Sequence, residues 1–197
     1  MSSTVRFLQE ENQRLLDRTQ ELEEENEHMR VILKSLVGLL GTVAKVGSDM
    51  DLNSLLNRIV YEAVRIVDAV EGSLLLLDEE QQQLVFVASR SKMKDQLIGF
   101  RIPISTGIAG WVVTHQEPVI ANDVMQDERF SASVDKRLQF KTQSLLAVPL
   151  ISRGRPLGVI ELVNKFSDQR FDDEDVETVS TLAPIAAAVI DLAAIED

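Results

Sequence analysis

Cysteine is absent from the 197-residue sequence, and this absence excludes several kinds of chemistry. Without thiols the chain can form no disulfide, build no thiolate metal site, and offer no thiol nucleophile or attachment point for a thioether-linked chromophore. Its two histidines, His28 and His115, are far apart in the sequence. A haem or transition-metal site therefore has few ligands to use. We expect His115 to lie in solvent after a short helix.

Long apolar runs are also missing. No stretch of about 18 consecutive apolar residues occurs, and Met1-Ser2-Ser3-Thr4 leads directly into charged sequence without a signal-type hydrophobic segment. We therefore expect no membrane span and no export, which places the chain in the cytoplasm.

Positive charge is scarce, and this limits the partners. The formal net charge is -12, and residues 166–197 alone hold nine acidic residues against one arginine. Attraction to phosphate supplies most non-specific affinity for nucleic acid, so an acidic chain is a poor nucleic-acid binder. We expect neither DNA nor an anionic membrane as a partner. The hydrophobic content of 45% is sufficient for one core of ordinary size.

A seven-residue repeat marks residues 1–47 as a dimerisation helix and its junction. The repeat falls on Leu8, Leu15, Leu22, Met29 and Leu36. Three positions before each lie Val5, Asn12, Thr19, Asn26 and Leu33. These sets fill the d and a positions of a parallel two-stranded coiled coil, in which each asparagine pairs with its equivalent. No basic region precedes the repeat in this sequence, so we do not expect a DNA-binding zipper. The alternative is a monomeric helix folded back on the following domain.

Hydrophobic spacing predicts a mixed domain over residues 48–197. Helical spacing covers 52–67, and a final helix is expected from Asp172, with Asp175 completing a capping box. Pro184 should kink or split that helix, because proline removes a backbone donor. Strand-like segments are Ser73 to Leu77, Leu84 to Ser89, Ile98 to Ile104, Pro118 to Ala121, Ser144 to Ile151 and Leu157 to Asn164. These elements predict an α+β fold with helices packed on a sheet.

Both faces of the predicted sheet need cover. In residues 144–150 both alternating sets of side chains are apolar or small, which is typical of a strand buried on two sides. The segment left to cover the second face is 107–141, with a short helix over 107–115 and a polar helical or loop region over 123–141. Short helices and loops arched over a sheet favour a concave pocket for a small molecule.

Several separated motifs resemble the signature of GAF domains. They are residues 102–112, 116–124, 127–130, 144–150 and 158–165. The resemblance covers about residues 50–195, with the motifs in the expected order. It implies a six-stranded antiparallel sheet with helices on both faces and a ligand pocket under the short helices. Such domains bind cyclic nucleotides, other small effectors or chromophores, and commonly dimerise through their terminal helices.

A narrower resemblance is to the cyclic-nucleotide-binding GAF domains of phosphodiesterases and adenylyl cyclases. Their motif corresponds here to Asn164-Lys165, Phe171 and Asp175, but Val176 stands where a glutamate is expected. In that group the motif is a clasp in which the lysine pairs with the aspartate, so it implies little about ligand choice. The alternative role of Asp175 is helix capping.

The resemblance also implies ligand-binding positions. They are Ser73, Ile108, Ala109, Asp123, Thr142 and Glu161. Backbone N–H groups at a helix start near Gly107 would independently form a seat for an anion. Glu161 shares its strand face with Leu157, Val159 and Val163, and a carboxylate on an apolar face needs a donor. A purine edge would supply one. The alternatives are a cross-strand ion pair and an exposed edge position.

One basic cluster lies in the segment expected to cover the pocket. It consists of Arg129, Lys136, Arg137 and Lys141. These side chains would either steer an anion toward the pocket or form a solvated helix face, the commoner arrangement.

Enzymatic activity finds little support in the sequence. No Ser-His-Asp grouping, P-loop or paired metal-ligand spacing occurs, and GAF relatives that reduce free methionine sulfoxide rely on cysteines. We expect a dimeric sensor that binds a small effector, with a cyclic nucleotide the leading candidate. No output domain follows, so its signal should pass to a partner protein in trans. The alternative is a dimeric interaction scaffold with a vestigial pocket, which a pocket filled by its own side chains would favour.

The heptad repeat predicts a parallel homodimer, since Arg18 would face Glu23 of the partner chain and Glu25 would face Arg30. Replacing Leu15 and Leu22 with lysine should give a monomer with a folded domain, because lysine cannot be buried unpaired in the seam. Light scattering would report the mass, and circular dichroism the fold.

The register of this dimer has a separate check. In a parallel, in-register pair, a Leu22→Cys variant should oxidise to an interchain disulfide, and no native cysteine competes. Failure to form the disulfide would contradict the register, and a mass of one chain for the unmodified protein would contradict the dimer.

Overall fold

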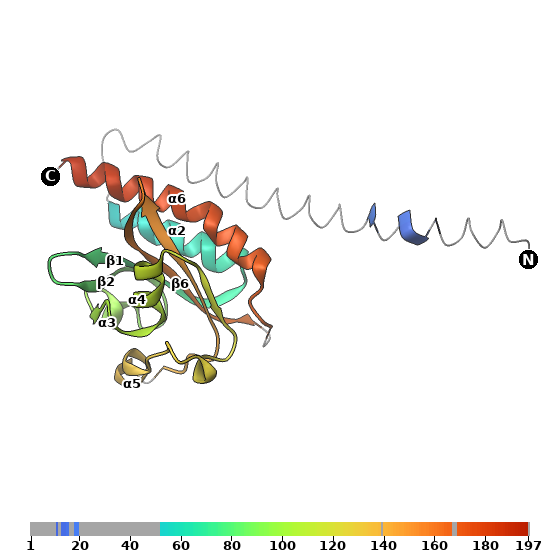
Figure 1. The fold of residues 1–197 in the computed structure, drawn as a ribbon, viewed down its shortest axis with the longest axis horizontal. Coiled ribbons are helices and arrows are strands. Elements are labelled where there is room, and N and C mark those ends of the chain that lie inside the picture. The colour runs from blue at the N-terminus through green and yellow to red at the C-terminus, as the bar shows by residue number, and fades with distance from the viewer. Residues whose placement is uncertain are drawn as a thin grey trace, which may run out of the picture. The chain divides into compact units, whose positions relative to one another are not determined.

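The computed structural model describes residues 11, 13–15, 18–19, 52–138, 140–166 and 169–196 (Figure 1). The chain divides into two compact units, Met1–Gly38 and Leu39–Asp197. In the first unit the described residues are helical, and the Leu15 side chain is 54% exposed in the single chain. Most positions of the predicted coiled coil lie outside the described residues. The same holds for the predicted boundary between residues 47 and 48.

The second unit is built on a six-stranded antiparallel sheet in the order β3-β2-β1-β6-β5-β4. Its strands are β1 (Ala69–Asp78), β2 (Gln83–Arg90), β3 (Arg101–Pro103), β4 (Val119–Ala121), β5 (Leu145–Ser152) and β6 (Arg155–Lys165). The predicted α+β class and the six-stranded antiparallel sheet are thus confirmed. The long central strands β1 and β6 pair with each other and bring distant parts of the chain together.

Two long helices cover one face of the sheet. Helices α2 (Leu52–Ile66) and α6 (Asp173–Glu196) lie side by side there (Figure 1). Helix α2 turns the apolar stripe predicted from its spacing inward, and its side chains at Leu56, Ile59 and Ala63 are fully buried or nearly so. In the part of the chain that is described, no helix is long and apolar enough to cross a membrane.

Helix α6 begins with the predicted capping box. The Asp172 N–H donates to Asp175 Oδ2 and the Asp175 N–H donates to Asp172 Oδ1, both at 3.0 Å. Pro184 lies inside this helix without splitting it, so that part of the expectation is wrong. Proline deprives the Ser180 carbonyl of one donor, and because Pro184 is exposed, solvent can take the donor's place.

Short elements cover the opposite face, as the burial of β5 on both sides requires. All six residues from Leu145 to Leu150 are buried. The covering elements are α3 (Lys94–Leu97), α4 (Gly107–His115), the 3-10 turn η1 (Val124–Gln126) and α5 (Ser133–Leu138). Helix α4 contacts β5 and β6 directly. The second face of the sheet is therefore covered by residues from the segment 107–141, as predicted.

The predicted strand from Ile98 to Ile104 is too long. Residues 98 and 99 form a turn, and β3 starts at Arg101. Gly99 has a φ of +79°, a left-handed conformation that ends extended backbone, while its N–H donates to Phe86 O at 2.8 Å. Apolar side chains therefore alternate in this segment because a turn packs against β2, and not because the strand is longer.

Gly110 allows α4 to approach the chain just before it. A Cβ atom at Gly110 would lie 2.0 Å from Ile104 O, whereas a Cβ at Gly154 would meet no atom within 4 Å. We expect Gly110→Ala to lower the free energy of unfolding by about 3 kcal/mol or more, because the added Cβ would force backbone atoms to move. Gly154→Ala, at a φ of +77°, should cost about 1 kcal/mol for its left-handed conformation. Urea denaturation would measure both, and equal losses would contradict the close approach.

Candidate functional site

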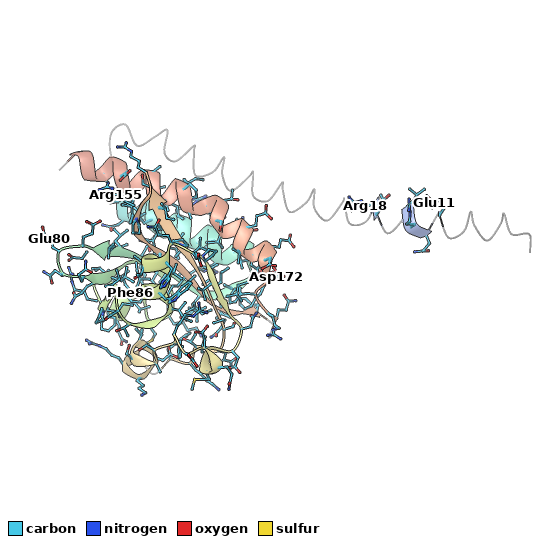
Figure 2. All side chains as sticks on the ribbon, in the orientation of Figure 1. Glu11, Arg18, Glu80, Phe86, Arg155 and Asp172 are labelled. Atoms are coloured by element: carbon cyan, nitrogen blue, oxygen red, sulfur yellow. The ribbon has the colours of Figure 1, made fainter. Side chains whose placement is uncertain are left out.

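A cavity lies between the sheet and the short elements that cover its second face. Strand residues such as Ser73, Phe86 and Glu161 form one wall, and residues of the α4 and α5 segments such as Ile108 and Asp135 form the other. Phe86 lies in the interior of the unit, among the strands (Figure 2). The cavity volume of about 100 Å³ is several times the roughly 10–15 Å³ that one water needs.

Glu161 is the unusual group in this cavity. It lies on β6 opposite Ser73 of β1 and Ala147 of β5. Its side chain is part-buried, and its remaining surface opens into the cavity. Among the described residues nothing donates a hydrogen bond to its carboxylate or pairs with it. The alternatives of a cross-strand ion pair and an exposed edge position are therefore wrong.

Burial sets the protonation of this carboxyl. Removal from water raises the pKa of Glu161 from 4.5 to about 7, with a further contribution from the negative charge of Asp135. Near neutral pH the group is thus divided between a carboxylic acid and a carboxylate. A ligand that donates N–H groups would favour the carboxylate, because hydrogen bonds to the charged form lower a pKa.

Asp135 is a cavity residue that sequence reasoning missed. It lies on α5, and its carboxylate accepts from Thr142 N at 2.8 Å and from Thr142 Oγ1 at 2.7 Å. These two bonds fix the carboxylate at the cavity wall. From the sequence, this segment was predicted only to be a polar helix or loop. An acidic residue in a segment expected to cover the pocket is too common a feature to identify Asp135 as a site residue.

The start of α4 provides backbone donors at the cavity. Gly107, Ile108 and Ala109 line it, and the N-cap residue Thr106 makes no side-chain capping bond. The first N–H groups of a helix have no partner within the helix, so they are available to an anionic group. This is the arrangement that the sequence predicted near Gly107.

The basic cluster does not reach the cavity. Arg129 chelates Asp127, with bonds of 2.9 and 2.7 Å to the carboxylate, and lies over the Trp111 ring at 4.7 Å. This pairing holds the pKa of Asp127 below its ordinary value. Arg137 lies over the Phe100 ring at 4.6 Å.

The charged side chains that line the cavity are all acidic. They are Glu71, Asp135 and Glu161, without a lysine, arginine or histidine from the described residues. Glu71 is already engaged, because Ser91 Oγ donates to its carboxylate at 2.6 Å. A ligand's negative charge would therefore have to be met by the backbone donors of α4.

The remaining predicted site residues lie outside the cavity. Lys165 Nζ is 2.6 Å from Asp175 Oδ2, and both side chains are nearly buried, at 11% and 10% exposure. This is the clasp that the resemblance implied, and breaking such a buried pair typically costs about 3–5 kcal/mol. Phe171 is buried and bound at its backbone by the Asn122 side chain.

Two further expectations concern single residues. Asp123 caps η1, with its Oδ1 accepting from Met125 N at 3.2 Å, and does not line the cavity. His115 is exposed, as predicted, and its ring stacks on Trp111. Within the described ranges, no group of three or more histidine, aspartate or glutamate side chains is placed to hold a metal ion.

Comparison with known proteins identifies this architecture. The family model of the GAF domain matches residues 49–191. The chain belongs to the GAF domain family. Its fold is shared with a GAF domain from a phosphoenolpyruvate-protein phosphotransferase of Coxiella burnetii, with a TM-score of 0.71 at 22% identity, over 84% of this chain and 97% of that one.

Curated relatives of this GAF domain include cyclic nucleotide phosphodiesterases. The chain is 34% identical over 152 residues to the dual 3',5'-cyclic-AMP and -GMP phosphodiesterase 11A of Takifugu rubripes, covering 71% of this chain and 16% of that protein. It is 31% identical over 120 residues to the cone cGMP-specific 3',5'-cyclic phosphodiesterase subunit alpha' of Mus musculus, covering 59% of this chain and 14% of that protein. The chain thus spans about a sixth of the length of these relatives. With the family model, the similarity identifies a small-molecule sensing domain of the GAF type.

The raised pKa of Glu161 predicts an unusual pH dependence of stability. Between pH 4.5 and about 7 the folded state retains a proton that the unfolded state has released, so the contribution of this group is lost as the pH rises. Glu161→Gln should remove this loss. Across the interval from 4.5 to about 7 the difference corresponds to on the order of 3 kcal/mol, with the variant the more stable protein above pH 7.

Urea denaturation of both proteins between pH 4 and 8.5 checks this expectation. The difference between the two unfolding free energies isolates Glu161, since the other acidic groups are common to both. Parallel pH profiles would mean that Glu161 ionises at its ordinary pKa and that the cavity does not exclude water from it.

Proposed function

We propose that this GAF domain senses a small effector bound in the cavity under α4 and α5, and that the effector is a cyclic nucleotide. The observation that carries the proposal is the unpartnered Glu161 carboxyl at an open cavity. Buried polar groups are ordinarily paired, and a carboxylate without a donor costs free energy. A site of this kind is completed by a ligand that brings its own donors.

A cyclic nucleotide suits the two polar regions of the cavity. Its single phosphate charge would bind the free N–H groups at Gly107 to Ala109, and N–H groups of its base would donate to Glu161. A ligand with a single negative charge also suits the cavity better than a more highly charged one, because its lining has acidic side chains and no cation from the described residues. The similarity to phosphodiesterases named for cyclic AMP and cyclic GMP gives separate support.

The open cavity favours a sensor over a scaffold with a vestigial pocket. A vestigial pocket would be filled by side chains, whereas about 100 Å³ remains free. The Glu161 carboxyl facing that space is also a poor way to fill a core, because it loses hydration without gaining a hydrogen-bond partner. The arrangement is better explained by retained binding.

The proposed output is non-enzymatic. The heptad repeat supports a homodimer, and the acidic surface supports a protein partner in trans rather than nucleic acid or a membrane. Ligand binding would act by shifting the populations of two arrangements of the dimer, which requires that the ligand bind one arrangement more tightly than the other.

Calorimetric titration with cyclic AMP, cyclic GMP and cyclic dinucleotides, at pH 8 with protein shown by native mass spectrometry to be empty, tests the ligand. One of these should bind, and Glu161→Ala should weaken its binding by about 1.5–3 kcal/mol, the range for hydrogen bonds to a charged group. Asp123→Ala is the matched control, because Asp123 lies outside the cavity and the variant should bind as the unmodified protein does.

Two results would count against the cyclic nucleotide. One is no heat and no thermal shift with any of these compounds at millimolar concentration. The other is equal weakening by Glu161→Ala and Asp123→Ala, which would place the ligand elsewhere.

A further inference from the structure

Asn164, near the end of β6, has the left-handed backbone conformation, with a φ of +55°. Asparagine adopts this conformation more readily than most residues. Its side-chain Oδ1 accepts from Gln143 N at 2.8 Å and Ser144 N at 3.2 Å, and its Nδ2 donates to Lys141 O at 3.1 Å. One side chain thus binds three backbone groups in the segment that leads into β5.

The residue between these backbone groups is Thr142. The N–H and the hydroxyl of Thr142 both donate hydrogen bonds to the Asp135 carboxylate. Asp135 in turn lines the cavity and acts on Glu161 through its charge. Hydrogen bonds and one short backbone segment therefore connect Asn164, which lies outside the cavity, through Thr142 to Asp135 in the cavity wall.

We propose that Asn164 is a positioning residue for the ligand site. By holding residues 141–144, it fixes the position of Thr142. Thr142 in turn fixes the position of the Asp135 carboxylate relative to Glu161. This role is separate from the Lys165–Asp175 clasp, although the two are adjacent in sequence. The clasp joins β6 to the start of α6, whereas Asn164 joins β6 to the cavity wall. The inference rests on the proposed function for its purpose, but its test uses protein without ligand.

Loss of the Asn164 amide has a definite consequence for Glu161. Without its three bonds, residues 141–144 keep the backbone bonds from Val124 N to Gln143 O and from Asn164 N to Ser144 O, but Thr142 fixes Asp135 less firmly. The like charge then moves away from Glu161. The carboxylate of Glu161 becomes easier to form, so its titration midpoint falls. A residue that only stabilised the fold would not move this midpoint.

The test variant is Asn164→Gly, because glycine keeps the left-handed backbone and removes only the amide. The charged groups facing Glu161 in the cavity are Asp135 from α5 and Glu71 from β1. The Glu161 midpoint would be read by carbon-13 NMR of glutamate carboxyl groups, with the resonance assigned by its absence in Glu161→Gln. We expect it to fall by about half a unit or more.

Asn122→Ala is the matched control. Asn122 also holds a backbone segment with its amide, at Phe171, with bonds of 2.9 and 2.8 Å, but it does not touch residues 141–144. Its loss should leave the Glu161 midpoint unchanged. The double variant Asn164→Gly/Asp135→Asn should titrate as Asp135→Asn alone does, because the effect of Asn164 passes through Asp135.

An unchanged midpoint in Asn164→Gly, or an equal fall in Asn122→Ala, would overturn the proposal. If Asn164→Gly does not fold, Asn164→Asp replaces it, since aspartate keeps the two acceptor bonds and loses the donor to Lys141 O. Its effect on the midpoint is measured with and without Asp135→Asn, because the direct effect of the added charge is common to both backgrounds. A more negative shift when Asp135 is present is expected, and equal shifts would overturn the proposal. Whether a cyclic nucleotide binds does not affect either result.

Discussion

The sheet is buried on both faces, and this constraint shapes the rest of the domain. Residues Leu145 to Leu150 of β5 are all buried, so apolar side chains project in both directions and each face must be covered. Two long helices, α2 and α6, cover one face closely. The other face is left to short helices and connecting segments, which cannot pack as densely over a sheet. The cavity is the result of this difference between the two layers.

The same constraint explains the chemistry of the cavity. A short covering segment exposes the free N–H groups of α4 to the cavity, because the N-cap residue Thr106 offers no side-chain bond. It also brings Asp135 of α5 over the strand that carries Glu161. Removal of Glu161 from water raises its pKa to about 7. The backbone donors and the acidic side chains of the cavity thus follow from the way in which short elements cover the second face of the sheet.

The strands, the two long helices and the double-sided burial of β5 were predictable from sequence, because hydrophobic periodicity reports burial directly. Glu161 was also predictable, since a carboxylate interrupts an apolar strand face. Two features were not. The turn at Gly99 keeps an apolar alternation that imitates a strand, and Asp135 acquires its role only through contacts with Thr142, seven residues away. Such contacts depend on the path of a loop, which periodicity does not encode.

The acidic lining has a consequence for the selectivity of the proposed nucleotide site. The neutral backbone donors of α4 can accept the charge of one phosphate, but a second or third phosphate would meet Glu71 and Asp135 rather than a cation. Each added charge would lose hydration without gaining a partner. If the proposed cyclic nucleotide is the effector, nucleoside diphosphates and triphosphates should bind less well, because the described cavity wall offers no cation for their additional charge.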